Sequence, residues 1–271
     1  MGLGSDFARD GYVVVPGALD RATAGDLAAR AWRIAEAEAA RAPLSIFTTD
    51  VDHRVVDDWF LDSGHTVRAF FEEDALRDGG LDRPAARAVN KVGHALHVLD
   101  PVFGPFFRDP AWLGLLVELG LPDPRPVQSM LIYKPPEVGG VVRWHQDETY
   151  LRASPGPVIG LWWAFEDATA ENGALQVAPG QHHEPPRLAF RREGRRTWHE
   201  TLDERPLPIE GARTLEVEAG TLIAFHGRLP HASAPNRSSR SRVAATLHSV
   251  DRAAVWAPDN WIEHRWTSGQ V

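Results

Sequence analysis

The spacing of apolar residues differs between the two halves of the chain. In the first half, apolar side chains recur near helical spacing, and Asp20 and the pair Asp109-Pro110 stand where a helix N-cap and first turn are expected. A short apolar run at residues 11–17 ends in Pro-Gly and predicts a strand. The predicted helices cover residues 20–40, 84–99 and 110–119. Residues 1–125 are therefore expected to form a largely helical part with short strands.

From about residue 126, short β-type runs bounded by Pro, Gly or Asn replace the helical pattern. These runs cover residues 127–134, 139–147, 157–167, 172–180, 213–227 and 242–250. Several short strands without helices between them are typical of an antiparallel sandwich or barrel. We therefore expect a mainly β protein with some α structure, in which a jelly-roll core over residues 126–255 carries the N-terminal helices on its outside.

One stretch of the second half breaks the strand pattern. Residues 181–213 are rich in Arg, Pro and Glu and have little periodicity, which predicts an insertion over one end of the barrel. Long segments of this kind are often active-site lids. Neither an internal repeat nor a linker composition is visible, and all-β domains reach this length, so residues 1–271 are expected to form a single domain.

Composition and charge narrow the possible partners. The 271 residues are 43% hydrophobic and 24% charged, as in an ordinary globular protein. A net charge of -8, with both signs interspersed, argues against a nucleic acid or an anionic membrane as partner, and it favours a small-molecule substrate. No run approaches the roughly 18 apolar residues of a spanning helix, and the early Asp6 and Asp10 do not fit a signal peptide. We expect a soluble, cytoplasmic protein.

The chain contains no cysteine. Disulfides, thiolate catalysis, Cys-ligated zinc and iron–sulfur clusters are therefore excluded, and any transition metal must bind to His and carboxylate side chains. Only two of the 29 basic residues are lysines, Lys91 and Lys134. A lysine retained in such an arginine-rich chain is a candidate for a specific task.

The sequence Trp144-His145-Gln146-Asp147 is the strongest local signal for chemistry. Residues i and i+2 of a strand point to the same face, so His145 and Asp147 can present an imidazole and a carboxylate side by side. A third ligand must come from elsewhere, and we favour His231, which follows a β-type run, over His226. Two His and one carboxylate form the ligand set of non-haem Fe(II) oxygenases.

An oxygenase of this kind that uses 2-oxoglutarate also needs an anchor for the distal carboxylate of that co-substrate. A guanidinium suits a carboxylate because it offers two parallel N–H donors. Arg242 lies at the start of the strand that follows His231, and Arg240 stands two residues earlier on the same predicted face. Periodicity alone does not separate the two arginines.

An ordered series of segments resembles the phytanoyl-CoA dioxygenase family, particularly its phytanoyl-CoA dioxygenase domain-containing branch. The resemblance covers most of the chain and lies in FARDGYVVVPGAL at 7–19, NKVGHALHVLDPVF at 90–103, VQSMLIYKPPEVGGVVRWHQD at 127–147, GLWWAFEDATAENGALQVAPGQH at 160–182, HASAPNRSSRSR at 231–242 and WAPDNW at 256–261. It implies a double-stranded β-helix, a jelly-roll barrel, which agrees with the strand pattern.

The same resemblance implies a cofactor set and roles for individual residues. His145, Asp147 and His231 match the ligands of Fe(II), and Arg242 matches the arginine that pairs with the C5 carboxylate of 2-oxoglutarate, with O₂ as the second co-substrate. Further residues match positions that line the co-substrate pocket in relatives, namely Lys91, Met130, Gln146, Trp163 and Ser233. The implied activity is that of a dioxygenase that hydroxylates a small molecule.

Two features limit what the resemblance implies. Asp147 keeps the carboxylate that related halogenases replace with a small residue, which speaks against halogenation. Residues 181–213 match the relatives poorly, so the branched acyl-CoA substrate of the named family is not carried over. Two rivals stay open, a jelly-roll isomerase or hydrolase that uses the metal without 2-oxoglutarate, and a non-catalytic jelly-roll binding protein.

Overall fold

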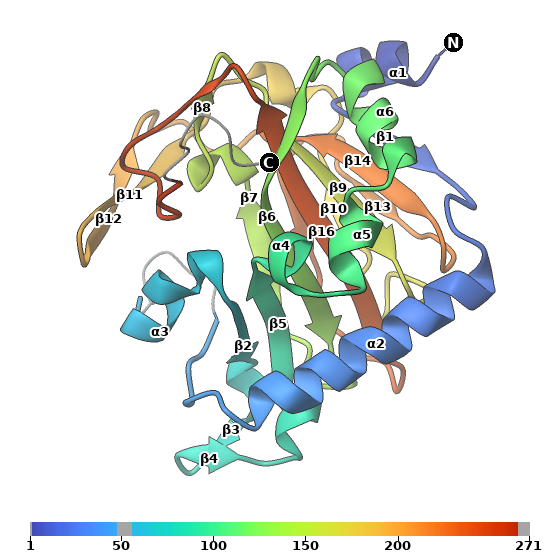
Figure 1. Ribbon diagram of the computed structural model, residues 1–271, viewed down its shortest axis with the longest axis vertical. Helices are drawn as coiled ribbons and strands as arrows, with labels where there is room; N and C mark the ends of the chain where they lie inside the picture. Colours follow the sequence, from blue (N-terminus) through green and yellow to red (C-terminus); the bar gives the residue numbers. More distant parts are fainter. Residues whose placement is uncertain (1, 48–55, 265–271) are drawn as a thin grey trace.

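Two antiparallel β-sheets form the framework of the computed structural model, which describes residues 2–47 and 56–264 (Figure 1). The larger sheet has the spatial order β1 (Tyr12–Val15), β14 (Leu222–His226), β9 (Ile159–Ala164), β16 (Arg242–Asp251), β6 (Pro124–Lys134), β5 (Val89–His94) and β2 (Val67–Phe71). The smaller sheet has the order β13 (Arg213–Leu215), β10 (Leu175–Val177), β15 (His231–Ser233) and β7 (Val142–His145). Chain neighbours are mostly not sheet neighbours, so the strands alternate between the two sheets.

The inner faces of the two sheets pack against each other. Trp162 and Phe225 of the larger sheet share one buried apolar cluster with Leu175 and Val177 of the smaller sheet. Crossing connections and an apolar layer between two antiparallel sheets define a jelly roll. The fold class expected from the strand pattern is therefore confirmed.

Helices cover the outer face of the larger sheet (Figure 1). They are α1 (Leu3–Asp10), α2 (Arg21–Ala39), α4 (Leu96–Leu99), α5 (Phe103–Phe107) and α6 (Pro110–Glu118), whereas α3 (Asp58–Leu61) packs in a separate apolar cluster that includes Trp261. The side chain of Asp20 caps α2 by accepting from the backbone N–H of Thr23, and Leu27 and Ile34 of this helix are buried against the sheet. The predicted helices over 20–40 and 110–119 are confirmed as α2 and α6.

The helix predicted over residues 84–99 is wrong. This stretch contains a short 3-10 turn, strand β5 and the single-turn helix α4. All six residues of β5 are buried, and the strand pairs with β2 and β6 on its two edges. A strand buried on both faces shows no alternation of apolar and polar residues, so its pattern is easily read as helical.

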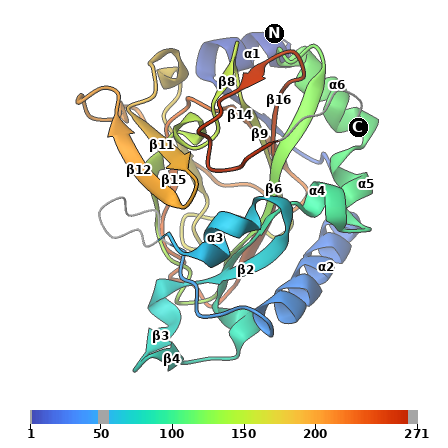
Figure 2. The ribbon, with the colours of Figure 1, turned by 60° about the vertical axis from the view of Figure 1, so that its left-hand side comes forward.

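The segment 181–213 holds a β-hairpin, β11 (Leu188–Glu193) and β12 (Arg196–Thr201), which lies beside α3 (Figure 2). Arg192 of the hairpin donates to the backbone carbonyls of Leu61, at the end of α3, and of Trp261. Four two-residue strands complete the set, β3 (Leu76–Arg77), β4 (Gly80–Leu81), β8 (Ala153–Ser154) and β17 (Val255–Trp256). Within the described ranges, none of the helices is long and apolar enough to cross a membrane.

Candidate active site

The expected metal ligands come together on neighbouring strands of the smaller sheet. His145 ends β7, His231 begins β15, and the two residues are register partners across this antiparallel pair. Asp147 opens the 3-10 turn Asp147–Thr149 that follows β7. One ligand atom from each residue lies within 4.8 Å of the others, and both Nε2 atoms are 3.7 Å from Oδ1 of Asp147. The structure thus groups His231, and not His226, with the pair.

Backbone carbonyls hold both imidazoles in one orientation. Nδ1 of His145 lies 2.8 Å from the carbonyl oxygen of Arg143, and Nδ1 of His231 lies 3.0 Å from that of Leu229. Because a carbonyl only accepts hydrogen bonds, each Nδ1 carries the proton and each Nε2 presents its lone pair to the centre of the group. This arrangement fixes the tautomer that a metal ligand needs.

A third histidine, His248 of β16, holds the carboxylate. Its Nε2 lies 2.9 Å from Oδ2 of Asp147, so Oδ1 is the oxygen that faces the two ligand histidines. Sequence reasoning missed His248, although it stands six residues after Arg242 in one predicted strand, where residues at even spacing share a face. That spacing is the signal that could have found it.

The protonation states suit a metal. Burial lowers the pKa of His145 to about 4, and the nearby His231 acts in the same direction. Burial works to raise the pKa of Asp147, but His248, His231 and His145 outweigh burial and hold this pKa below its usual range. At neutral pH the site therefore offers a neutral imidazole and an ionised carboxylate, the forms that bind a transition metal. Nitrogen and oxygen donors without thiolate fit Fe(II).

Arg242 lies in the barrel interior at the other end of β16. Its Nη2 donates to the carbonyl oxygen of Gly173 at 3.1 Å, whereas its buried Nε and Nη1 have no hydrogen-bond partner among the described residues. Burial lowers its pKa to about 10, so the guanidinium keeps its charge at neutral pH. Such unsatisfied N–H donors in a buried cation fit the carboxylate of a ligand. Arg240 is exposed, so the structure distinguishes the two arginines.

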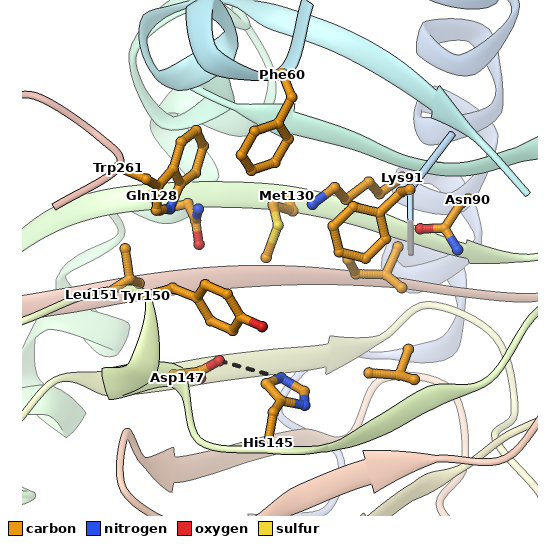
Figure 3. Close-up of a pocket in the computed structure, with 13 residues that line it drawn as sticks. Phe60, Asn90, Lys91, Gln128, Met130, His145, Asp147, Tyr150, Leu151 and Trp261 are labelled. Carbon is orange, nitrogen blue, oxygen red and sulfur yellow. Dashed lines mark ion pairs between the residues drawn. The ribbon is translucent and has the colours of Figure 1, made fainter. Parts of the chain in front are cut away.

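Three other expected residues face the same interior. Ser233 stands two residues after His231 in β15, and its buried Oγ has no partner in the part of the chain that the structure describes. Met130 and Lys91 line the cavity beside His145 and Asp147 (Figure 3). The ammonium of Lys91 is buried and lies over an aromatic ring of the cavity wall, at 3.3 Å from the ring centroid.

Two expected residues lie elsewhere, which corrects their assignment. Trp163 points to the outer face of β9 and packs against Phe106 of α5, with 5.1 Å between ring centroids. Its neighbour Trp162 points inward, and the guanidinium of Arg242 lies 5.5 Å from its ring centroid. Adjacent residues of a strand point to opposite faces, so an assignment that is off by one position selects the tryptophan on the wrong face of β9.

Gln146 is also placed away from the co-substrate pocket. It lies between two inward-pointing residues, so its side chain points to the other side of the chain. Its Nε2 donates to the carbonyl oxygen of Arg228 at 2.8 Å, and its Oε1 accepts from the backbone N–H of Arg187 at 3.1 Å. Gln146 therefore fastens the segment 181–213 to the end of β7.

A cavity of about 130 Å³ opens beside the His-Asp-His group (Figure 3). Aromatic side chains form much of its wall, those of Phe47, Phe60, Tyr150 and Trp261. The hairpin supports this wall, because Phe190 of β11 packs against Tyr150 with 5.7 Å between ring centroids. The segment 181–213 thus contributes to the surroundings of the site, as its position in the sequence suggested.

Comparison with known proteins agrees with this geometry. The profile of the phytanoyl-CoA dioxygenase (PhyH) family matches residues 7–244. A phytanoyl-CoA dioxygenase domain-containing protein 1 homolog of Caenorhabditis elegans is 35% identical over 275 residues, which cover 96% of this chain and 94% of the relative. A phytanoyl-CoA dioxygenase of Arabidopsis thaliana is 41% identical over 224 residues, covering 81% of this chain and 78% of the relative.

Solved structures support the fold. The non-heme alpha ketoglutarate dependent carbocyclase SnoK from nogalamycin biosynthesis has a TM-score of 0.65 at 20% sequence identity, over 95% of this chain and 86% of that one. At this identity the likeness concerns the fold alone. The family profile and the two relatives each cover most of the chain, and the profile's range includes the His-Asp-His group. This chain therefore belongs to the phytanoyl-CoA dioxygenase family.

Proposed function

We propose that this protein is an Fe(II)- and 2-oxoglutarate-dependent dioxygenase that hydroxylates an aliphatic C–H bond of a small molecule. The observation that carries the proposal is the presence, in one barrel interior, of a preoriented His-Asp-His group and a buried arginine with unsatisfied donors. A protein that only bound a metal would not need the arginine. The names of the family's relatives, dioxygenases, support the same activity.

In this proposal, His145, Asp147 and His231 would hold the iron. When bound, iron and 2-oxoglutarate supply oxidative decarboxylation to succinate and CO₂, with the two atoms of O₂ divided between succinate and the substrate C–H bond. Arg242 binds the distal carboxylate of 2-oxoglutarate, and Ser233 offers its unpartnered hydroxyl on the same inner face. The charge of Lys91, at the cavity wall, favours a dianionic co-substrate there.

The residues of this chain contribute to the reaction by positioning the substrate and by keeping water out of the site. The aromatic wall would shield the metal site from water, and the hairpin beside Tyr150 would restrict how a substrate can approach. The carboxylate of Asp147 occupies the ligand position that a halide would need, which favours hydroxylation over halogenation. A protein with this fold is a carbocyclase, so product analysis must distinguish hydroxylation from ring formation.

The test is an anaerobic titration of the metal-free protein with Fe(II) and 2-oxoglutarate, following the weak visible charge-transfer band of a chelated keto acid. We expect a band that is lost in His145→Ala and needs more 2-oxoglutarate in Arg242→Ala. Arg240→Ala is the matched control, because this arginine is exposed and should leave the titration unchanged. Iron-loaded protein without a band would favour a metal enzyme that does not use 2-oxoglutarate.

A further inference from the structure

The cavity beside the metal group contains a polar side chain that the proposed chemistry does not use. Gln128 of β6 is 6% exposed and lines the cavity, with its carboxamide directed toward the interior (Figure 3). It has no hydrogen bond to any residue that the structure describes. The carboxamide faces the cavity, where it offers an acceptor oxygen and two N–H donors to a ligand.

Register places Gln128 next to the metal group but away from the co-substrate anchor. On the inner face of the β6–β16 pair, Gln128 is opposite His248, which holds Asp147, whereas Lys134 is opposite Arg242 at the other end. Directly opposed residues have Cβ atoms about 5 Å apart, and six residues of strand span roughly 20 Å. A molecule bound to Gln128 would therefore lie beside the metal on the side that 2-oxoglutarate does not occupy.

The surroundings of Gln128 define the rest of the ligand. Phe60 and Trp261 stack with 4.5 Å between ring centroids at the same end of the cavity, and Leu151 and Tyr150 form the adjoining wall. The charged side chains of the lining are Lys91, which lies across from Ile132 in the neighbouring strand, and Asp147 at the metal. Phe60, Trp261 and Leu151 give the wall at this end an apolar surface, and the ammonium of Lys91 lies 5.4 Å from the ring centroid of Phe60. An uncharged polar group fits between such apolar side chains at a lower desolvation cost than a charged one.

We propose that Gln128 is a substrate-binding residue, and that the substrate is a small molecule with an apolar body and an uncharged amide of the lactam or carboxamide type. Such an amide places a C=O acceptor and an N–H donor side by side, which complements the carboxamide of Gln128 in a paired hydrogen bond. The aromatic wall covers the apolar body. This inference rests on the proposed function, since it assigns the substrate end of the same cavity.

The paired hydrogen bond makes a specific demand on ligand chemistry. A site built to hydrogen-bond an N–H discriminates strongly against an analogue of the same shape that lacks it, because the buried partner is then unpaired. The probes are δ-valerolactam and cyclohexanone, six-membered rings that share a carbonyl and differ in the N–H group. For each probe, we compare its affinity for the original protein with its affinity for a variant at position 128. The free energy of hydration of the free probe is the same in both measurements and therefore cancels.

The experiment measures the dissociation constants of both probes by saturation-transfer NMR, using the full chain loaded with Zn(II) and 2-oxoglutarate. We expect Gln128→Met, which keeps the length of the side chain, to weaken δ-valerolactam at least about tenfold and cyclohexanone less than threefold. Gln176→Met is the matched control, because Gln176 bonds to Thr214 at the exposed edge of the smaller sheet. That variant should change neither affinity.

Equal weakening of both probes in Gln128→Met, an unchanged lactam affinity, or no lactam binding to the unaltered protein would each overturn the proposal. Unfolding midpoints of the variants separate a loss of binding from a loss of fold. The charge-transfer titration with iron does not depend on Gln128. A normal band with no lactam selectivity would therefore reject this inference alone, whereas a missing band would reject the proposed function.

Discussion

The two ends of the β6–β16 strand pair differ in charge. At one end the register partners are two buried basic residues, Arg242 and Lys134, and burial lowers the pKa of Lys134 to about 7. At the other end the partners are Gln128 and His248, a carboxamide and an imidazole. The charged end suits a dianionic co-substrate, whereas the uncharged end faces the aromatic wall. The basic side chains thus lie on the long strands β6 and β16. At the end of the strand pair that contains Gln128, α3, the hairpin and the segment around Trp261 close the cavity.

This difference predicts which end of the strand pair tolerates amino-acid substitutions. A buried basic side chain needs fixed partners, and Lys134 donates to the carbonyl of Gly140 while Arg242 donates to that of Gly173. Such a constellation loses its function if one member moves. The aromatic wall depends mainly on apolar packing, which accepts exchange of similar side chains. We therefore expect changes at Arg242 to act on 2-oxoglutarate, and changes at Gln128 and in the aromatic wall to act on substrate.

The largest effect should come from the group between the two ends. His231→Ala removes one of three metal ligands, and we expect Fe(II) affinity to fall by more than about 100-fold, because two ligands leave the ion poorly held. Calorimetric titration with Fe(II) under anaerobic conditions measures the loss. His183→Ala is the control, since His183 is exposed and outside the group. Iron affinity that survived in His231→Ala would contradict the assignment of the site.

The second effect distinguishes the buried Arg242 from the exposed Arg240. Arg242→Lys keeps a positive charge but loses the paired N–H donors, so the apparent affinity for 2-oxoglutarate should fall about 10- to 100-fold. Arg240→Lys should leave it unchanged. The titration by charge-transfer absorption measures both variants. A fall of similar size in both variants would mean that the structure does not distinguish the two arginines.

The third effect concerns His248, at the uncharged end. His248→Phe removes the hydrogen bond that holds Oδ2 of Asp147, and we expect Fe(II) affinity to drop about tenfold, as for other residues that orient metal ligands. His248→Gln can still donate to the carboxylate and should recover part of the affinity. The 2-oxoglutarate requirement at saturating iron should stay the same in both variants, and a raised requirement would mean that the two ends are not independent.

The smallest effect comes from buried histidines that belong to neither end. Burial lowers the pKa of His97 to about 4 and that of His226 to about 3. Their unfolded forms take up protons first as the pH falls below about 6.5, so stability present above that pH is lost toward the folded values. From pH 7 to pH 6 we expect a loss of roughly 0.7 kcal/mol for each histidine.

Urea unfolding of the metal-free protein at the two pH values measures this loss. His97→Gln and His226→Gln should each reduce the pH dependence, because neither amide titrates in this range. A free energy of unfolding that did not depend on pH between these values would contradict the burial of both imidazoles.

Short-range patterns in the sequence were sufficient for most strands of the jelly-roll core and for part of the site. Asp20 marked the start of α2, and the spacing of His145 and Asp147 placed both on one face at the end of β7. Longer-range features were harder. β5 is buried on both faces, so the run over 84–99 lacked alternation and was read as a helix. The choice of Trp163 failed because one position of register decides which of two adjacent tryptophans faces inward.

By itself, the sequence determined the class of fold, the donor set available to a metal and the family, because these depend on periodicity, residue type and ordered motifs. Only the tertiary structure decided which groups meet. It brought His248 to Asp147 and Gln128 opposite His248, and it turned Gln146 toward Arg187. These contacts join segments far apart in the chain, and they follow from strand register and sheet packing, which local spacing does not contain.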